Sequence, residues 1–252
     1  MKWATRFVDR QRGENDSNPE SNGEFALLGC LAPGLKRVVD GGANRGEWAG
    51  WLWKRNRGLE LACVEPHPTL ASAAEKRLQG TGARVFRAAL GAEDGEAELH
   101  VYADEYSEGH SLYRRESIGV SYGVAAQTRS VRVPVWKVDR VLAEAGWETA
   151  CYLKLDVEGH EPEVLRGAEA ALKEGRVGAG QFEYGGTYID ARVLLKDAFA
   201  VLTATGCEVF LVMPWGLRRV GAYDSRLENF QFKTFAFFRR GNPLLERCRV
   251  EG

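Results

Sequence analysis

The order of apolar and polar stretches along the chain predicts strands that alternate with helices. Short apolar runs, typical of buried strands, are separated by segments in which apolar residues recur at helical spacing. This alternation is typical of an α/β fold with a mostly parallel sheet. The strand-like runs cover residues 35–39, 59–64, 83–88, 151–157, 177–182, 208–212 and 230–238. The helical segments cover residues 20–31, 48–52, 70–78, 164–172 and 190–205.

Two parts of the chain depart from this order. Residues 96–102 and 130–135 alternate between apolar and polar positions, which predicts an antiparallel pair of strands. The long segment between them is unpatterned, and we interpret residues 103–128 as a lid over a pocket. Residues 1–24 are polar and predict an irregular lead-in, so that 1–32 forms a lead-in and helix. Glu24 and its polar neighbours either reach the site or only cap the helix.

Composition narrows the class of protein. The chain has 252 residues, of which 44% are hydrophobic and 27% charged, and we expect a single domain over 1–252. The net charge of −1 gives no electrostatic reason to expect nucleic acid or a membrane as partner. We expect a cytoplasmic protein, because no signal-peptide pattern or membrane-length apolar run is present. The five cysteines are widely spaced, which favours free thiols over disulfides or zinc ligands.

A glycine-rich turn follows the first strand-like run. The run ends in Asp40, and the turn continues through Gly41, Gly42, Ala43, Asn44 and Gly46 before helical spacing begins. Glycines let a backbone approach a ligand closely, and the N–H groups of a helix start face such a ligand. The spacing matches neither a dinucleotide fingerprint nor a P-loop, so an ordinary strand–helix turn is the alternative interpretation.

The next two strand-like runs contain further candidates for nucleotide binding. Glu65 follows Asp40 by 25 residues, close to the offset at which an acid binds ribose hydroxyls in such folds. Pro66 then introduces the next helix. The third run ends in the small residues Ala88 and Ala89, which could border an adenine ring.

Three ionisable residues alternate along the run at 151–157 and its end. Lys154, Asp156 and Glu158 therefore project toward one side of the strand, where burial without partners would cost several kcal/mol. A self-contained Lys154–Asp156 ion pair is the structural alternative to a catalytic cluster. His160, at the start of the next helix, is as consistent with a helix-start residue as with a catalytic one.

Glu183 ends the following strand-like run. If that strand neighbours the one with Lys154, Glu183 stands beside Asp156 and could orient or deprotonate a substrate hydroxyl. Asp156, Glu158 and Glu183 could instead hold Mg²⁺, which prefers oxygen ligands, although we do not favour a metal.

Several of these motifs together resemble the FkbM-type S-adenosylmethionine-dependent methyltransferases. The similarity extends from about residue 18 to residue 238, and its most specific block is the K-x-D-V-E-G motif. Gly41 stands where that family usually has Val or Ile, and His160 stands where Ala is common. The segments that carry the resemblance are 39–46, 64–66, 133–139, 153–161, 165–168 and 181–183.

The resemblance implies a Rossmann-like three-layer sandwich, with a seven-stranded, mostly parallel sheet whose last strand is antiparallel. It also implies S-adenosylmethionine as cofactor and S-adenosylhomocysteine as product. The turn with Asp40 would hold the amino acid end of the cofactor, Glu65 the ribose, and Ala88–Ala89 the adenine edge. Asp156 would lie near both cofactor and acceptor. The implied catalytic residues are Lys154, Asp156, Glu158, His160 and Glu183.

The implied activity is methyl transfer, most simply to a hydroxyl of a sugar, glycan or natural-product small molecule. Two alternatives stay open: N-methylation of a peptide or amide, and a non-catalytic subunit that only binds the cofactor. A nicotinamide-dependent oxidoreductase is disfavoured by the glycine spacing. The sequence identifies neither the acceptor nor the oligomeric state.

Overall fold

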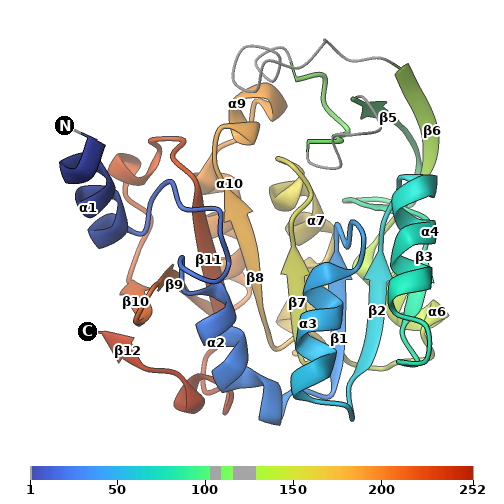
Figure 1. Cartoon of the computed structure of the whole chain (residues 1–252), viewed down its shortest axis with the longest axis horizontal. Coiled ribbons are helices and arrows are strands. Elements are labelled where there is room, and N and C mark those ends of the chain that lie inside the picture. Colours follow the sequence, from blue (N-terminus) through green and yellow to red (C-terminus); the bar gives the residue numbers. More distant parts are fainter. Residues whose placement is uncertain (1, 103–108, 116–128, 252) are drawn as a thin grey trace.

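A nine-stranded sheet forms the centre of the molecule, within the residues that the structure describes (Figure 1). The computed structural model describes residues 2–102, 109–115 and 129–251, so most of the predicted lid lies outside it. The strand order is β12-β10-β9-β11-β8-β7-β1-β2-β3. The strands are β1 (Arg37–Gly41), β2 (Glu60–Val64), β3 (Arg84–Phe86), β7 (Tyr152–Leu155), β8 (Ala179–Tyr184), β9 (Cys207–Met213), β10 (Gly216–Val220), β11 (Lys233–Arg239) and β12 (Val250–Glu251).

The pairing pattern confirms the predicted fold class. Strands β3, β2, β1, β7 and β8 run parallel, and β11 lies antiparallel between β8 and β9. This is the Rossmann-like arrangement with an antiparallel last strand. The strand count differs from the expected seven, because β10 forms a hairpin with β9 and β12 adds to its outer edge.

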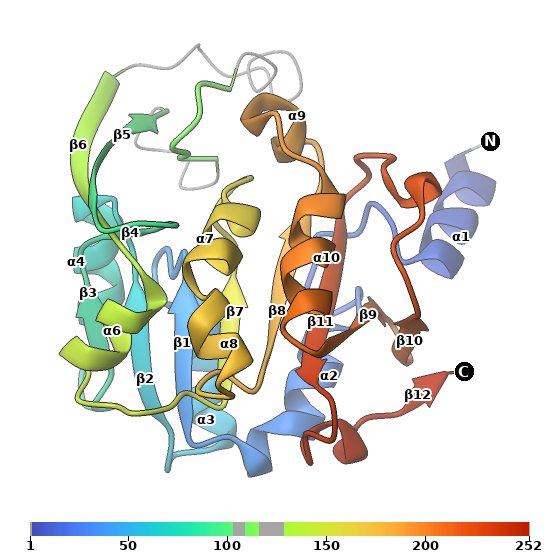
Figure 2. The same cartoon turned by 180° about the vertical axis from the view of Figure 1, so that it is seen from behind.

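Helices cover both faces of the sheet and make the third layer. Figure 1 shows one face, which carries α2 (Glu24–Leu31), α3 (Glu47–Arg55) and α4 (Pro68–Arg77). Figure 2 shows the other, which carries α6 (Val138–Glu144), α7 (Glu161–Gly167), α8 (Glu169–Lys173) and α10 (Leu195–Ala204). A hydrophobic core lies on each face of the sheet, and successive side chains of a strand point into alternate cores. Val38 packs on the α2–α3 side and Val39 on the α6–α10 side. The remaining helical elements among the described residues are α1 (Lys2–Arg12), α9 (Thr187–Ala191), and 3₁₀ turns at Ala32–Gly34, Ser225–Leu227 and Leu245–Arg247.

A separate three-stranded sheet has the order β4-β6-β5. It consists of β4 (Ala89–Leu90), β5 (Gly95–Val101) and β6 (Arg129–Trp136). The antiparallel pairing of β5 with β6 confirms the prediction for residues 96–102 and 130–135.

Several sequence-based element predictions were wrong. Residues 2–12 form α1 rather than an irregular lead-in, because a polar segment can still contain good helix formers such as Lys, Ala, Arg and Gln. Helix α2 begins only at Glu24, after Gly23 with φ 103°. The helix expected at 190–205 is two helices, because Arg192 adopts a left-handed conformation with φ 57° and ends α9.

Two further features bear on earlier expectations. Within the described part of the chain, no helix combines the length and apolar character needed to cross a membrane. All five cysteines are free, as predicted, and Cys63 and Cys207 are buried.

Candidate functional site

The carboxyl ends of β1, β7 and β8 bring the sequence-predicted residues together. The register pairs Asp40 with Lys154 across β1 and β7, and Lys154 with Gln181 across β7 and β8. Glu183 lies two residues beyond Gln181 on β8, so the predicted adjacency of the Lys154 and Glu183 strands is confirmed. Carboxyl ends of parallel strands are the usual ligand position in open α/β sheets.

A narrow pocket opens over the ends of β1 and β2. The predicted residues that line it come from the glycine turn, the end of β2, the β3–β4 junction and the segment after β7: Gly42, Asn44, Glu65, Pro66, Ala88, Ala89, Asp156, Glu158 and His160. Apolar side chains complete one wall: Val64, Leu70, Leu90, Leu99 and Leu112. A pocket with polar groups on one side and small and apolar groups on the other suits a nucleoside.

Gly42 shapes the floor of this pocket. Its φ is 72°, and a Cβ atom there would lie 1.8 Å from the backbone oxygen of Asp156. Asn44, also left-handed with φ 49°, follows within the same turn. Glycine at position 42 is therefore required twice, by the backbone conformation and by the close approach of the segment after β7.

Glu65 is buried at the edge of the pocket. Its two carboxylate oxygens accept the N–H groups of Asn44 at 2.8 Å and His67 at 2.9 Å. Burial raises its pKa to about 7, although these hydrogen bonds act in the opposite direction. Glu65 thus ties the glycine turn to the end of β2 and presents its carboxyl group to the pocket.

A second, wider cavity adjoins the first, and the two share Gly42, Asn44, Gly109, Asp156 and Glu158. Carboxyl groups dominate its polar lining: Glu24, Glu47, Asp156, Glu158, Glu161 and Glu183. Its aromatic lining is Phe25, Trp48, Tyr184 and Phe232. The cationic side chains among its described lining residues are Lys154 and Arg115. We call this space the acceptor cavity, after the methyl acceptor that we propose for it.

Lys154 connects three elements beneath the acceptor cavity. Its Nζ atom lies 3.3 Å from both Asp40 and Asp156, and 3.1 Å from the backbone oxygen of Gly42. Burial lowers the pKa of Lys154, but Asp40 and Asp156 raise it more, so the side chain stays cationic. The predicted Lys154–Asp156 ion pair exists, but it forms part of the cavity wall and includes Asp40.

Glu183 faces the acceptor cavity from β8. Burial raises its pKa well above the ordinary value, and the neighbouring charge of Asp156 raises it further. A carboxyl group with a raised pKa is a stronger base once it has lost its proton. Glu24 and Glu161 also have raised pKa values, but they already accept hydrogen bonds from the protein, so Glu183 is the best candidate to accept a proton.

A chain of hydrogen bonds fixes the part of the acceptor-cavity wall that includes Glu24 and Trp48. Glu24 accepts hydrogen bonds from Trp48 Nε1 at 2.8 Å and from Gln181 Nε2 at 2.6 Å. Tyr152 donates in turn to Gln181 Oε1 at 3.0 Å. These bonds join α2, α3, β7 and β8, so Glu24 belongs to the cavity rather than only capping its helix.

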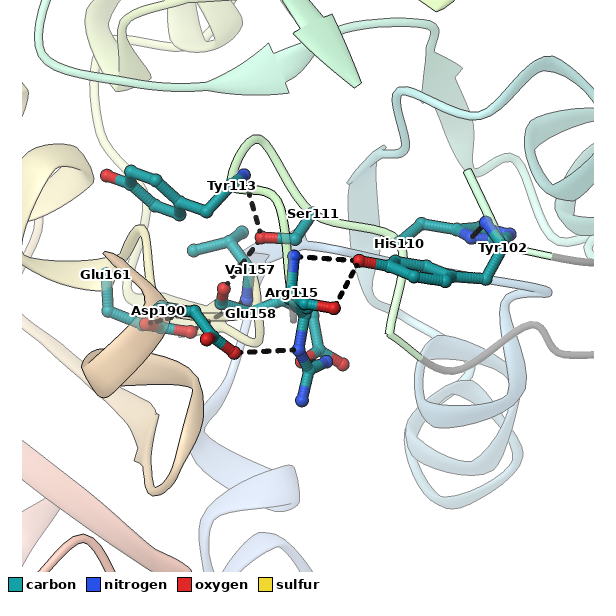
Figure 3. A network of polar contacts seen from close by, with 10 residues as sticks. Tyr102, His110, Ser111, Tyr113, Arg115, Val157, Glu158, Glu161 and Asp190 are labelled. Atoms are coloured by element: carbon teal, nitrogen blue, oxygen red, sulfur yellow. Dashed lines mark hydrogen bonds and ion pairs between the residues drawn. The ribbon is translucent and has the colours of Figure 1, made fainter. Parts of the chain in front are cut away.

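The described part of the predicted lid, residues 109–115, packs against the turn after β7 (Figure 3). Ser111 Oγ donates to the backbone oxygen of Glu158 at 3.0 Å, and the Tyr113 hydroxyl lies 2.7 Å from His160 Nδ1. Arg115 donates to the Glu158 carboxylate at 2.7 Å. Within this segment, Gly109, His110, Ser111 and Leu112 line the narrow pocket.

Some predicted residues lie away from the cavities or have other partners. Asp40 and Gly41 lie within β1 and Gly46 precedes α3, and none of the three is among the residues that line either cavity. His160 borders the narrow pocket and not the acceptor cavity, and its Nδ1 atom contacts the Tyr113 hydroxyl. The described residues contain no His, Cys, Asp and Glu group arranged to hold a metal ion.

Sequence reasoning missed the roles of Arg115, Tyr113 and Glu161. Glu161 is buried and accepts the N–H groups of Val157 at 2.9 Å and Gly159 at 3.0 Å, which fixes the turn after β7. Its position just inside a helix start was a usable signal for such a bond. The two lid residues gave no local signal, because their partners lie more than 40 positions away.

Together, the fold and site define a Rossmann-like α/β protein with a nucleoside-type pocket beside an acid-lined cavity. A sequence profile described as the methyltransferase FkbM domain matches residues 40–201, more than half of the chain. The chain therefore belongs to the methyltransferase FkbM family, which confirms the resemblance found in its motifs. A search of curated proteins found no significant match.

Among solved structures, several methyltransferases are similar at low sequence identity. A TehB-like SAM-dependent methyltransferase from Corynebacterium glutamicum is 15% identical with a TM-score of 0.45, covering 95% of this chain and 97% of its own. An O-methyltransferase from Bacillus cereus in complex with SAH is 12% identical with a TM-score of 0.47, covering 89% and 83%. The plantazolicin methyltransferase BamL is 8% identical with a TM-score of 0.47, covering 94% and 90%. The family assignment rests on the profile match and not on these distant similarities.

Proposed function

We propose that this protein transfers the methyl group of S-adenosylmethionine to a hydroxyl group of a sugar, glycan or other natural-product small molecule. The observation that carries the proposal is the direct contact between two cavities. One has the glycine turn and Glu65 of a nucleoside site, and the other has a half-buried base candidate, Glu183.

The residues of the narrow pocket fit the proposed cofactor. The left-handed turn at Gly42 and Asn44 leaves room for the amino acid end, and Glu65 offers a carboxyl group to the ribose hydroxyls. Ala88 and Ala89 border the space for the adenine ring. When bound, the cofactor supplies an activated methyl group on a sulfonium sulfur, and the protein has to orient the acceptor and remove its proton.

The acceptor cavity favours an uncharged or cationic acceptor with several hydrogen-bond donors. Its described lining contains six carboxyl groups but only Lys154 and Arg115 as cations. The carboxyl groups that are ionised would repel an anionic acceptor. Carboxylates accept hydrogen bonds from hydroxyl groups, and the aromatic walls can cover the apolar face of a sugar ring.

Within this cavity, we assign different roles to the charged residues. Glu183 accepts the proton of the attacking hydroxyl. Asp156 and Glu158, which border both cavities, orient that hydroxyl toward the narrow pocket. Lys154 is held between Asp40 and Asp156 and fixes the position of the Asp156 carboxylate. Alignment of the reactants can contribute about 7–11 kcal/mol, and a general base adds roughly 10²–10⁴-fold in rate.

The test is a binding measurement followed by an acceptor screen. Isothermal titration with S-adenosylmethionine, S-adenosylhomocysteine and NAD should give binding of the first two only. Labelled methyl donor is then offered to a panel of neutral sugars, amino sugars, hydroxylated natural products, peptides and carboxylated sugars. We expect label in uncharged or cationic acceptors that carry hydroxyl groups, and none in the carboxylated sugars. Binding of NAD alone would refute the proposed cofactor.

The same screen separates the alternatives. Label in peptide amides would show N-methylation instead. A non-catalytic subunit would be favoured if the protein binds the cofactor but methylates no acceptor, and if the Glu183→Gln variant binds the cofactor as the wild type does. Loss of transfer on chelation and recovery with Mg²⁺ would support a metal at Asp156, Glu158 and Glu183.

A further inference from the structure

Arg115 connects three parts of the molecule that are far apart in sequence. Its Nη1 atom donates to the Glu158 carboxylate at 2.7 Å, and its Nε atom lies 3.8 Å from Asp190 in α9. Its backbone N–H donates to the Tyr102 hydroxyl at 2.8 Å, and that hydroxyl lies 3.2 Å from the Arg115 backbone oxygen. Figure 3 shows the guanidinium group extending toward Glu158 and Asp190.

The ion pair with Glu158 is well shielded from solvent. The Arg115 side chain is 11% exposed, and those of Glu158 and Asp190 are 25% and 12% exposed. Shielding strengthens the attraction between opposite charges, so this contact differs from an ordinary surface ion pair. The backbone of Glu158 adopts an unfavourable left-handed conformation with φ 56°.

The position of Arg115 relates it to the narrow pocket. The four residues Gly109, His110, Ser111 and Leu112 line that pocket, and Arg115 ends the same described segment. On the other side of the contact, Glu158 and His160 line the pocket from the turn after β7. The contacts of Arg115, Tyr113 and Ser111 therefore join two opposing walls of one pocket.

We propose that Arg115 is a positioning residue that clamps residues 109–115 onto the turn after β7 and thereby slows the release of cofactor from the narrow pocket. This inference rests on the proposed function, because it assumes that the pocket binds S-adenosylmethionine and S-adenosylhomocysteine. The clamp acts through the Glu158 carboxylate and not through contact with the reacting atoms. Its loss should therefore raise the dissociation rate far more than it changes the association rate.

The chain offers a matched control in Arg114. That residue lies on the same segment and is exposed, and it is not among the residues that line either cavity. Arg115→Met and Arg114→Met thus remove the same charge from neighbouring positions, one inside the clamp and one outside. Glu158→Gln removes the partner charge with little change of shape.

The experiment measures S-adenosylhomocysteine binding by stopped-flow tryptophan fluorescence, with the melting temperature of each ligand-free variant. We expect Arg115→Met to dissociate at least 10-fold faster than the wild type, Arg115→Lys to recover part of the difference, and Arg114→Met to match the wild type. The Arg115→Met/Glu158→Gln double variant should be no faster than Arg115→Met, because both changes break one contact.

Two outcomes would overturn the inference, and they are distinguishable from failure of the proposed function. If Arg115→Met, Glu158→Gln and Arg114→Met all release S-adenosylhomocysteine at the wild-type rate, the contact does not retain the cofactor. A lower melting temperature with unchanged dissociation would assign Arg115 to stability alone. If the wild type binds no S-adenosylhomocysteine at millimolar concentration, the proposed function itself fails, and the inference fails with it.

Discussion

The Nζ atom of Lys154 lies 3.3 Å from Oδ1 of Asp40, and the two side chains are only 5% and 0% exposed. The strand register explains the contact, because Asp40 of β1 and Lys154 of β7 are direct partners. Asp40 is thus the buried counter-ion of Lys154, rather than a residue of the pocket wall. Lys154 in turn reaches Asp156 at the border of the two cavities.

Removal of the Asp40 charge should destabilise the protein. Asp40→Asn leaves the buried Lys154 cation with less compensation, and breaking a buried pair in this way typically costs about 3–5 kcal/mol. Urea unfolding measures the effect. The exposed pair Arg87–Glu75, at 50% and 45% exposure, provides the control, and Glu75→Gln should cost less than about 1 kcal/mol. Equal costs for the two variants would show that Asp40 contributes no more than a surface charge.

The close approach of the Asp156 backbone to Gly42 can be tested separately from the left-handed backbone conformation of that glycine. Gly42 and Gly80 have similar φ values of 72° and 80°, but only at Gly42 would a Cβ atom collide, 1.8 Å from the Asp156 backbone oxygen. Gly80→Ala should cost about 1–2 kcal/mol from conformation alone. Gly42→Ala should cost clearly more and weaken S-adenosylhomocysteine binding at least 10-fold. Thermal unfolding and titration calorimetry check both, and similar behaviour of the two variants would contradict the close approach.

Methyl transfer should depend on pH through Glu183. A base acts only when deprotonated, and burial raises the pKa of this carboxyl group, so the rate should increase as pH rises through that raised pKa. Glu183→Gln should lower the rate by about 10²-fold and abolish this limb of the profile. Asp156→Asn should also lower the rate by about 10²-fold or more, and should keep the limb but move it to lower pH, because the Asp156 charge helps to raise the pKa of Glu183. Cofactor affinity and melting temperature serve as controls, and a wild-type rate in Glu183→Gln would exclude its role as base.

His160 should make stability fall at acidic pH. Burial lowers its pKa from 6.5 to about 4, so between these values the unfolded chain binds a proton that the folded chain does not. Stability should therefore decrease as pH falls from 6.5 to 4, by about 3 kcal/mol at most. His160→Asn keeps an acceptor for the Tyr113 hydroxyl and removes the titration. The difference in melting temperature between pH 7 and pH 4.5 should be smaller in the variant, and an equal difference would contradict this assignment.

The sequence by itself determined the elements and the order of the candidate residues. Apolar runs that end in Asp40 and Glu65 located the strand ends, because periodicity and turn residues are properties of adjacent positions. The alternation of Lys154 with Asp156 allowed an ion pair as the structural alternative to a catalytic cluster, and the structure contains that pair. The fold class and the family followed from these local patterns.

The tertiary structure decided the partners. Asp40 pairs with Lys154 through the register of two strands separated by more than 100 residues, and periodicity carries no information about register. Arg115 reaches Glu158 only because the path of residues 109–115 brings it over the turn after β7. Glu183 has a raised pKa because burial and neighbouring carboxylates surround it, and burial is a property of the packed molecule. Local pattern therefore determines which elements form, whereas contacts between distant residues determine what their side chains can do.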